Sequence, residues 1–161
     1  MPLAYLSLGT NLGDRDHYLE LARLEIMEKF VKVRFSRIYE TEPVEFTDQP
    51  WFLNQVVEVQ TDLRPESLLE WAQSVEKKMG RQREVPKGPR TLDIDILMYG
   101  DEVRRSDRLT LPHPSMLDRR HVLVPLADLS PEMSIPSAGL SVREAYTKVK
   151  DRSQVKLHAP S

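Results

Sequence analysis

Two aspartates stand two residues apart in a short apolar stretch, Leu92-Asp93-Ile94-Asp95-Ile96-Leu97-Met98. Extended backbone places alternate side chains on opposite faces, so the prediction is one apolar face made of Leu92, Ile94, Ile96 and Met98. Both carboxylates then share the other face, roughly 7 Å apart. Like charges repel in a partly dry site unless a cation lies between them. Mg²⁺ binds through one or two carboxylates together with phosphate oxygens, so the pattern favours a magnesium site over a solvated acidic edge strand.

Basic residues flank this stretch on both sides. Residues 81–91 contain four basic residues and one acid, and residues 104–120 contain five arginines and two aspartates around His113. Either segment alone is equally well read as a solvated loop. Together they suggest an anionic ligand, because arginine binds phosphate through paired hydrogen bonds. Carboxylates that hold metal beside such arginines are the groups that phosphoryl transfer requires.

Composition limits the classes of protein that can carry this site. The chain has 161 residues, which predicts a single domain over residues 1–161. It has no cysteine, which excludes disulfides and thiolate chemistry. A net charge of −2 argues against a nucleic-acid partner, and short apolar runs broken by charge argue against a membrane partner. With no signal-like N-terminal segment, we expect a cytoplasmic monomer.

The elements that must position the aspartates follow the order β-α-β-β-α-β. Alternating apolar residues predict strands near residues 3–8, 31–35, 53–59 and 92–98. Two helices returning to such strands predict an α+β class with a ferredoxin-like core, an antiparallel sheet flanked by helices. The connections over residues 40–52 and 81–91 are long enough to be functional.

Caps and helical spacing predict where the helices lie. Asp14 suits the cap of a first helix whose inward residues are Leu19, Ala22, Ile26 and Phe30. Pro65 suits the start of a second helix that ends at Gly80 and whose inward residues are Leu68, Ala72, Val75 and Met79. Ser141 and Glu144 form a capping box for a last helix, which ends near Val149. We expect residues 150–161 to be a loosely held tail.

The segment Gly88-Pro89-Arg90-Thr91-Leu92-Asp93-Ile94-Asp95-Ile96-Leu97 resembles the signature of the 6-hydroxymethyl-7,8-dihydropterin pyrophosphokinase family of folate biosynthesis. The resemblance runs in order from about residue 3 to residue 129 and includes residues 7–15, 39–44, 49–54, 111–114 and 122–126. It implies transfer of the β,γ-pyrophosphoryl group of ATP to the hydroxymethyl oxygen of the pterin, with release of AMP.

The resemblance also implies roles for individual residues. Asp93 and Asp95 would hold two Mg²⁺ ions and would be catalytic together with Arg83 and Arg90. The residues implicated in ATP binding are Gln73, Glu76, Arg81, Arg83, Arg90, Arg108, Thr110, His113 and Arg119. Those implicated in pterin binding are Thr41, Val44, Phe52, Asn54 and His121.

Three positions depart from the family pattern. Pro86 replaces a basic residue, Lys87 stands where relatives can have an aromatic ring, and His121 stands where the family usually has Phe. Two other functions compete with the pyrophosphokinase. One is a noncatalytic ferredoxin-like ligand-binding domain, since fold alone does not decide function. The other is a metal-dependent phosphohydrolase, which would use ATP and water but no pterin.

Overall fold

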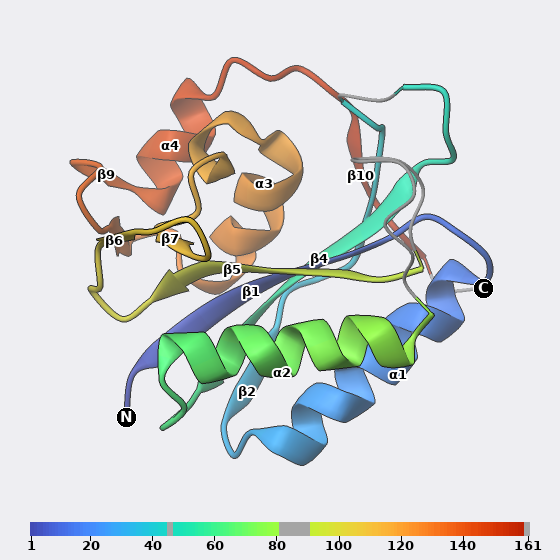
Figure 1. Ribbon diagram of the computed structural model, residues 1–161. Helices are drawn as coiled ribbons and strands as arrows, with labels where there is room; N and C mark the ends of the chain where they lie inside the picture. The colour runs from blue at the N-terminus through green and yellow to red at the C-terminus, as the bar shows by residue number, and fades with distance from the viewer. Residues whose placement is uncertain (45–46, 81–90, 160–161) are drawn as a thin grey trace.

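The computed structural model describes residues 1–44, 47–80 and 91–159 of the chain and centres on a six-stranded antiparallel sheet (Figure 1). Its strands run in the order β10-β3-β4-β1-β5, and β2 also pairs with β4. Their bounds are β1 Leu3–Thr10, β2 Val33–Phe35, β3 Tyr39–Thr41, β4 Phe52–Gln60, β5 Asp93–Tyr99 and β10 Val155–Leu157.

The connections between these strands give the sheet its ferredoxin-like order. β1 lies between β4 and β5 and is antiparallel to both. The helix α1 (Arg15–Lys29) leads from β1 to β2, and α2 (Pro65–Lys78) leads from β4 to β5. Each helix therefore joins two strands that have one strand between them, which is the split β-α-β arrangement. The predicted α+β class and ferredoxin-like core are confirmed.

One face of the sheet is covered by α1 and α2, which lie side by side below it in Figure 1. The backbone N–H of His17 donates to Asp14 Oδ1 at 3.1 Å, and Pro65 occupies the first position of α2, so both predicted helix starts are correct. The inward residues predicted for both helices are buried against Ala4, Leu6 and Leu8 of β1. The periodicity of the sequence thus predicted this core layer correctly.

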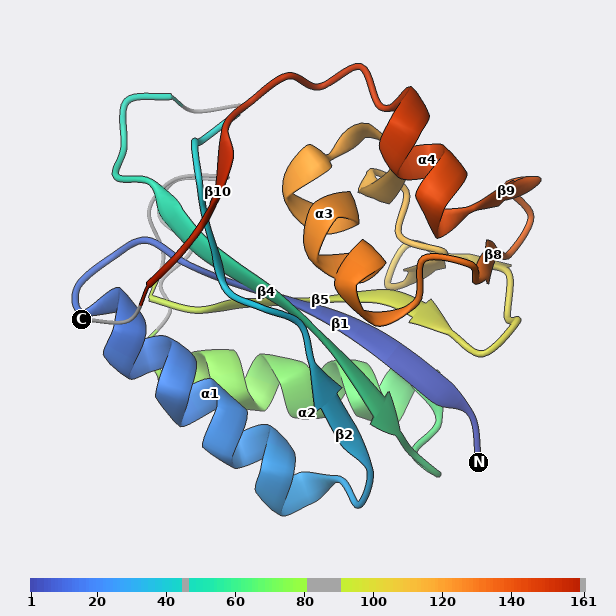
Figure 2. The same cartoon turned by 180° about the vertical axis from the view of Figure 1, so that it is seen from behind.

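The other face is partly covered by α3 (Arg120–Leu129) and α4 (Val142–Lys148), as the reverse view in Figure 2 shows. The Ser141–Glu144 capping box begins α4 as predicted. The sequence did not predict α3, which contains Pro125 and has no side-chain cap from its own N-cap residue. Smaller elements between these are β6 Arg104–Arg105, β7 Thr110–Leu111, the 3₁₀ helix η1 Met116–Asp118, β8 Ser134–Ile135 and β9 Leu140–Ser141.

The alternation predicted for residues 92–98 fails at its end. Tyr5 of β1 is opposite Met98 and Leu6 is opposite Ile96, so the register skips Leu97 and the strand is bulged there. A bulge reverses the facing of the residues that follow it. Met98 therefore packs with Leu97 under α3 and α4 instead of joining Ile94 and Ile96 under α1 and α2. The aspartates precede the bulge and keep their predicted common face.

Two expectations at strand edges are also corrected. Val31 was expected in the second strand, but this strand begins at Val33 and Val31 is 89% exposed. The tail was expected to be loosely held, but Val155–Leu157 pairs with β3 as an edge strand, with Val155 opposite Thr41. The edge of β3 offers unpaired backbone groups, and the tail satisfies them.

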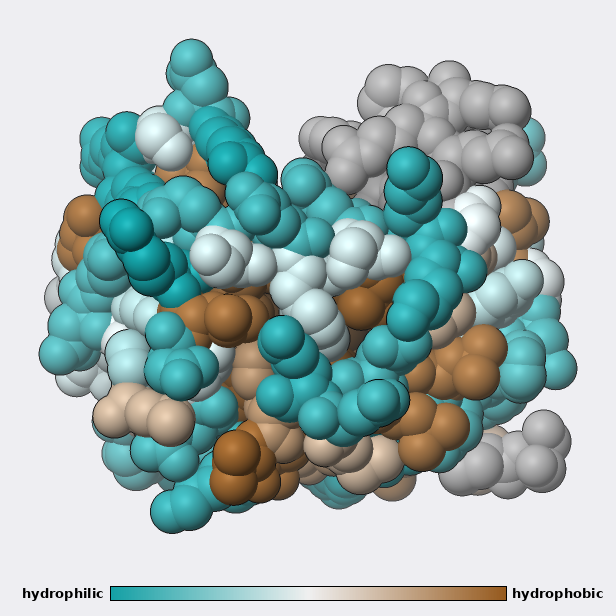
Figure 3. All heavy atoms as spheres, turned by 60° about the horizontal axis from the view of Figure 1, so that its bottom comes forward, coloured by the Kyte–Doolittle hydropathy of each residue, from teal (hydrophilic) through white to brown (hydrophobic). Residues whose placement is uncertain are grey.

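The outer surface of α1 and α2 comes forward in Figure 3 and is mostly hydrophilic, with scattered hydrophobic side chains. Leu24 and Met27 of α1 are about half exposed there. Among the described residues, no helix combines the length and apolar character needed to cross a membrane.

Candidate active site

A pocket opens on the face of the sheet that α3 and α4 leave partly uncovered. It is lined by β1, β3, β4, β5, the segment after β3 and the first turn of α3. The lining residues are Ser7, Gly9, Thr41, Glu42, Pro43, Val44, Gln49, Phe52, Asn54, Asp93, Asp95, Arg119, His121 and Val122. All five residues predicted to bind the pterin are therefore brought together with both predicted metal ligands.

The strand register explains this meeting of distant residues. Gly9 is opposite Asn54 of β4 on one side and opposite Asp93 of β5 on the other. Ser7, two residues earlier on the same face, is opposite Asp95. Side chains directly across a sheet are its nearest neighbours. The Asp93 carboxylate is thus separated from the Asn54 amide by a single strand, whose residue at that point, Gly9, has no side chain.

Gly9 keeps the floor of the pocket open. A Cβ at this position would lie 3.0 Å from Asn54 Nδ2 and 3.7 Å from Cδ2 of Phe52. The first distance is shorter than most real Cβ contacts, so the Asn54 amide would have to shift by a few tenths of an ångström. The close approach of the amide therefore favours glycine at this position.

The Asn54 amide is held in one orientation. Its Nδ2 donates to the Leu8 carbonyl at 3.3 Å, an acceptor that can face only the nitrogen. Its Oδ1 accepts from the Thr41 hydroxyl at 2.5 Å. Both side chains are buried. This arrangement presents a donor and an acceptor of known placement beside the Phe52 ring, which suits the edge of a planar heterocycle.

On the other side of the pocket, two groups approach the Asp95 carboxylate. The Nε2 atom of His113 is 3.9 Å from Asp95 Oδ2, and the Nη1 atom of Arg119 is 4.0 Å from the same oxygen. Both come from the region between β7 and α3, which passes over the C-terminal half of β5. They place one cation and one imidazole at the carboxylate without a tight salt bridge.

The His113 ring is neutral at physiological pH. Burial, followed by the Arg119 charge, lowers its pKa to about 4, against the opposing effect of Asp93. Its Nδ1 accepts from the backbone N–H of Ser115 at 3.1 Å, which assigns the proton to Nε2. The ring therefore presents an N–H donor, not a positive charge, toward the Asp95 side of the pocket.

The other described residues predicted to bind ATP do not line this pocket. Gln73 is exposed on α2. Arg108 pairs with Glu70 of α2 at 3.1 Å. Thr110 lines a separate hollow, to which His113 also contributes, bordered by the turn of residues 135–138. Arg81, Arg83, Arg90, Pro86 and Lys87 lie outside the described residues.

Glu76 has a placement that its predicted role did not anticipate. It is only 4% exposed, and its Oε2 accepts from the backbone N–H of Ile94 at 2.8 Å. Ile94 stands between the two aspartates. The Glu76 carboxylate therefore contacts the backbone of the strand that carries Asp93 and Asp95 directly.

Several pocket residues were absent from the predicted site, namely Ser7, Gly9, Glu42, Pro43, Gln49 and Val122. Gln49 is held by Asn11, whose Nδ2 donates to Gln49 Oε1 and to the Pro50 carbonyl, both at 2.9 Å. A signal for these residues existed, because all of them lie within the segments that carry the family resemblance. Their positions in the pocket depend on pairing between strands, which the sequence of these segments alone does not reveal.

The donor chemistry of Asp93 and Asp95 fits Mg²⁺. Within the described ranges, no group of three His, Asp or Glu side chains could hold a metal ion alone. Two carboxylates on one face form an incomplete set of hard oxygen ligands, which phosphate oxygens and water complete at magnesium sites. The pair can thus hold Mg²⁺ that arrives with a phosphorylated ligand.

Comparison with known proteins shows the family of the chain. Residues 5–131 match the model of the family described as 7,8-dihydro-6-hydroxymethylpterin-pyrophosphokinase (HPPK). A *Bacillus subtilis* relative, 2-amino-4-hydroxy-6-hydroxymethyldihydropteridine pyrophosphokinase, is 46% identical over 129 residues, covering 79% of this chain and 77% of that protein. The folic acid synthesis protein fol1 of *Pneumocystis carinii* is 43% identical over 148 residues, covering 91% of this chain but 20% of that protein.

The fold has solved counterparts as well. The crystal structure of wild-type *Plasmodium falciparum* HPPK-DHPS with pteroate superposes with a TM-score of 0.73 and 19% sequence identity. The match covers 91% of this chain and 42% of that chain. At this identity the comparison supports the fold. The chain spans about a fifth of the *Pneumocystis* relative and less than half of the *Plasmodium* one.

Proposed function

The chain belongs to the 7,8-dihydro-6-hydroxymethylpterin-pyrophosphokinase family, and on this premise we propose that it transfers the β,γ-pyrophosphoryl group of ATP to the hydroxymethyl oxygen of 6-hydroxymethyl-7,8-dihydropterin. The observation that carries the proposal is the row formed by Asn54, Gly9 and Asp93 across three strands. It supports a heterocycle at one end of the pocket and phosphate-bound metal at the other. The products are AMP and the pterin diphosphate.

The pterin end of the pocket uses Thr41, Val44, Phe52, Asn54 and His121. The Asn54 amide, oriented by Thr41, hydrogen-bonds the amide-like edge of the ring. The Phe52 and His121 rings supply apolar and stacking surface. These contacts direct the hydroxymethyl group toward Asp93 and Asp95, because those carboxylates are one strand away from Asn54.

The phosphate end uses Asp93, Asp95, His113 and Arg119. The two carboxylates hold Mg²⁺, and we propose two ions. When bound, Mg²⁺ neutralises phosphate charge and lowers the pKa of a coordinated hydroxyl. Arg119 adds a fixed positive charge, and the neutral His113 ring donates from Nε2. Gln73, Glu76, Arg81, Arg83, Arg90, Arg108 and Thr110 remain predictions for ATP binding, with Arg83 and Arg90 also catalytic.

The proposed transfer is direct and needs no covalent enzyme intermediate. The hydroxymethyl oxygen attacks the β-phosphorus, and the bond from that phosphorus to the oxygen shared with the α-phosphate breaks. AMP leaves with that oxygen, and the hydroxyl proton passes to solvent. Orientation of the two substrates and stabilisation of phosphate charge supply most of the rate in such transfers. We also propose that the enzyme is a monomer and acts in the cytoplasm.

Product analysis tests the proposal directly. The protein is incubated with ATP, Mg²⁺ and 6-hydroxymethyl-7,8-dihydropterin, and nucleotides and pterins are separated by chromatography. We expect AMP and pterin diphosphate in equal amounts, both dependent on the pterin. ADP or free phosphate formed without the pterin would instead identify a phosphohydrolase. Ligand binding without turnover would identify a noncatalytic binding domain.

A further inference from the structure

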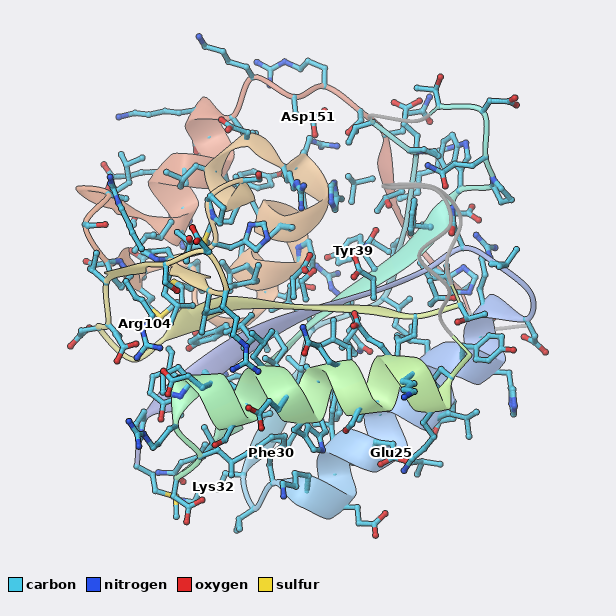
Figure 4. The ribbon with its side chains drawn as sticks, viewed as in Figure 1. Glu25, Phe30, Lys32, Tyr39, Arg104 and Asp151 are labelled. Atoms are coloured by element: carbon cyan, nitrogen blue, oxygen red, sulfur yellow. The ribbon has the colours of Figure 1, made fainter. Side chains whose placement is uncertain are left out.

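The C-terminal segment contacts the start of α3 before it joins the sheet beside β3. After α4 the chain crosses above α3 and descends as β10 along β3, as Figures 1 and 2 show from opposite sides. Figure 4 labels Asp151 on this crossing. The segment lies beyond residue 131, where the match to the family model ends.

Its first contact is with the start of α3. Asp151 Oδ2 accepts from the backbone N–H of Arg120 at 3.0 Å, and the Ser153 carbonyl accepts from Arg120 Nη1 at 3.0 Å. The N-cap residue of α3, Arg119, makes no side-chain cap of its own. Asp151 therefore supplies from a distant segment the acceptor and negative charge that a helix start favours. The same turn carries Arg119 and His121 into the pocket.

Asp151 is itself held in place. Its Oδ1 accepts from the backbone N–H of Ser153 at 2.8 Å. Burial acts to raise the pKa of Asp151, but hydrogen bonds from Ser153 and Arg120, together with the nearby His121, outweigh it and leave the pKa below its usual value. The carboxylate is thus ionised and fixed at neutral pH.

The second contact is with the opposite wall of the pocket. The backbone N–H of Gln154 donates to Glu42 Oε1 at 2.8 Å, and the Gln154 carbonyl accepts from the Glu42 N–H at 3.1 Å. Val155 then pairs with Thr41. Thr41 and Glu42 both line the pocket. Residues 151–154 therefore contact Arg120, which lies between the wall residues Arg119 and His121, and Glu42 of the opposite wall.

The far end of the segment is anchored outside the pocket. The backbone N–H of His158 donates to the Ile38 carbonyl at 2.9 Å, and its Nε2 is 3.0 Å from Asp16 Oδ1. Lys156 Nζ lies 5.4 Å from the centre of the Trp51 ring. Because the segment is anchored at this end, it can hold the residues that it contacts in place.

We propose that residues 151–158 belong to the pterin site and set the separation of its two walls, with Asp151 and the backbone N–H of Gln154 as positioning groups. Asp151 places the turn that carries His121, and Gln154 places Glu42 and, through β10, Thr41. The inference rests on the proposed function, since it names the ligand of this pocket. Arg119, on the capped turn, also approaches Asp95, but the segment contacts the phosphate end only through this turn, whereas it contacts the pterin end through Glu42 and Thr41 as well. We therefore expect pterin binding to be affected more than phosphate binding.

Two variants test whether these contacts affect pterin binding specifically or only the stability of the fold. Asp151→Ala removes the acceptor at Arg120, and Gln154→Pro removes the N–H that meets Glu42. Glu132→Gln is the control, because Glu132 pairs with Arg143 on the exposed surface away from the pocket. Binding of 6-hydroxymethylpterin is titrated at saturating Mg²⁺ and an ATP analogue with a methylene between its α- and β-phosphorus atoms. Binding of the analogue alone and the melting temperature are measured for each protein.

We expect the pterin Kd to rise about fivefold in both variants, the size that loss of one cap produces, and the analogue Kd to change less than about twofold. Asp151→Asn should recover part of the affinity, because its amide oxygen can still accept from Arg120. An unchanged pterin Kd with a lowered melting temperature, or equal losses for both ligands, would overturn the inference. Wild-type protein that fails to bind the pterin would contradict the proposed function itself, and the inference with it.

Discussion

The Glu76 carboxylate on α2 accepts a hydrogen bond from the backbone N–H of Ile94, the residue that separates Asp93 from Asp95. β5 is an edge strand of the main sheet, paired on one side with β1. An edge strand exposes backbone donors that need other partners. Glu76 supplies one from the helix layer, so the strand that carries both carboxylates is fixed from beneath as well as from the side.

This contact predicts that Glu76 matters for stability as well as for turnover. Glu76→Ala leaves a buried backbone N–H unsatisfied, which costs about 2 kcal/mol of unfolding free energy. Glu76→Gln should cost less, because its amide oxygen can still accept from Ile94. Urea unfolding and turnover are compared with Lys77→Ala, an exposed change on the same helix. If Glu76 contacts only ATP, the alanine variant will weaken nucleotide binding without any loss of stability.

The first layer of the fold was predictable because its signals are local. Asp14 and Pro65 mark helix starts within the sequence that they cap, and the inward residues repeat at helical spacing. α3 escaped prediction for the opposite reason. Its cap is Asp151, 31 residues further on, and Pro125 interrupts its pattern. A helix stabilised from a distant segment carries no local start signal.

In the candidate site, too, residues marked by a local pattern were predictable and residues placed by strand pairing were not. Asp93 and Asp95 were predictable from alternation within one strand, up to the bulge at Leu97. The row of Asn54, Gly9 and Asp93 required the register of three strands, which is set by packing across the sheet. The edge strand β10 was missed because its apolar-polar-apolar alternation covers only three residues, too few to distinguish a strand from a polar tail.

Removal of one of the carboxylates proposed to bind Mg²⁺ should abolish turnover without loss of the fold. Asp95→Asn keeps the size of the side chain but loses the charge that Mg²⁺ needs. The Asp95 side chain is 36% exposed, so the metal-free variant should unfold within about 0.5 kcal/mol of wild type. Asp101→Asn, in the exposed turn after β5, is the control. Near-normal turnover in Asp95→Asn would rule out the metal-ligand role.

The depressed pKa of His113 predicts a pH dependence of stability in metal-free protein. Above pH 6.5 the ring is neutral in both folded and unfolded chains. Between pH 6.5 and its folded pKa of about 4, the unfolded chain binds a proton that the folded chain does not. Stability from this group is therefore complete above pH 6.5 and is lost as the pH falls toward 4.

His113→Gln should remove that dependence. Between pH 7 and pH 4.5, the unfolding free energy of wild type should fall by about 2 kcal/mol more than that of the variant. The carboxylates Glu58 and Asp128, whose pKa values are lowered, also lose stability on acidification, but they do so equally in both proteins. Denaturant unfolding with a chelator present gives the difference. Parallel pH curves would show that His113 is not held neutral.

Gly9→Ala should weaken pterin binding more than it weakens ATP binding. The added Cβ would approach Asn54 Nδ2 to 3.0 Å, so the amide that Thr41 orients would have to shift by a few tenths of an ångström. Loss of an oriented hydrogen-bonding group costs a ligand about 1 to 2 kcal/mol, or about tenfold in Kd. Ser7→Ala, which removes an oxygen from the same face of β1, is the comparison. Similar pterin affinity in Gly9→Ala and wild type would mean that the ligand does not use Asn54.

His121→Phe should strengthen pterin binding. His121 lines the same pocket as Phe52, and a phenyl ring offers more apolar area for stacking than an imidazole. The gain should be about 1 kcal/mol, or about fivefold in Kd, with nucleotide binding unchanged. His17→Phe, an exposed change on α1, controls for the added ring. The pterin Kd of each protein is measured by titration at fixed pH with the methylene ATP analogue present. Equal Kd values for wild type and His121→Phe would mean that this side chain does not face the pterin.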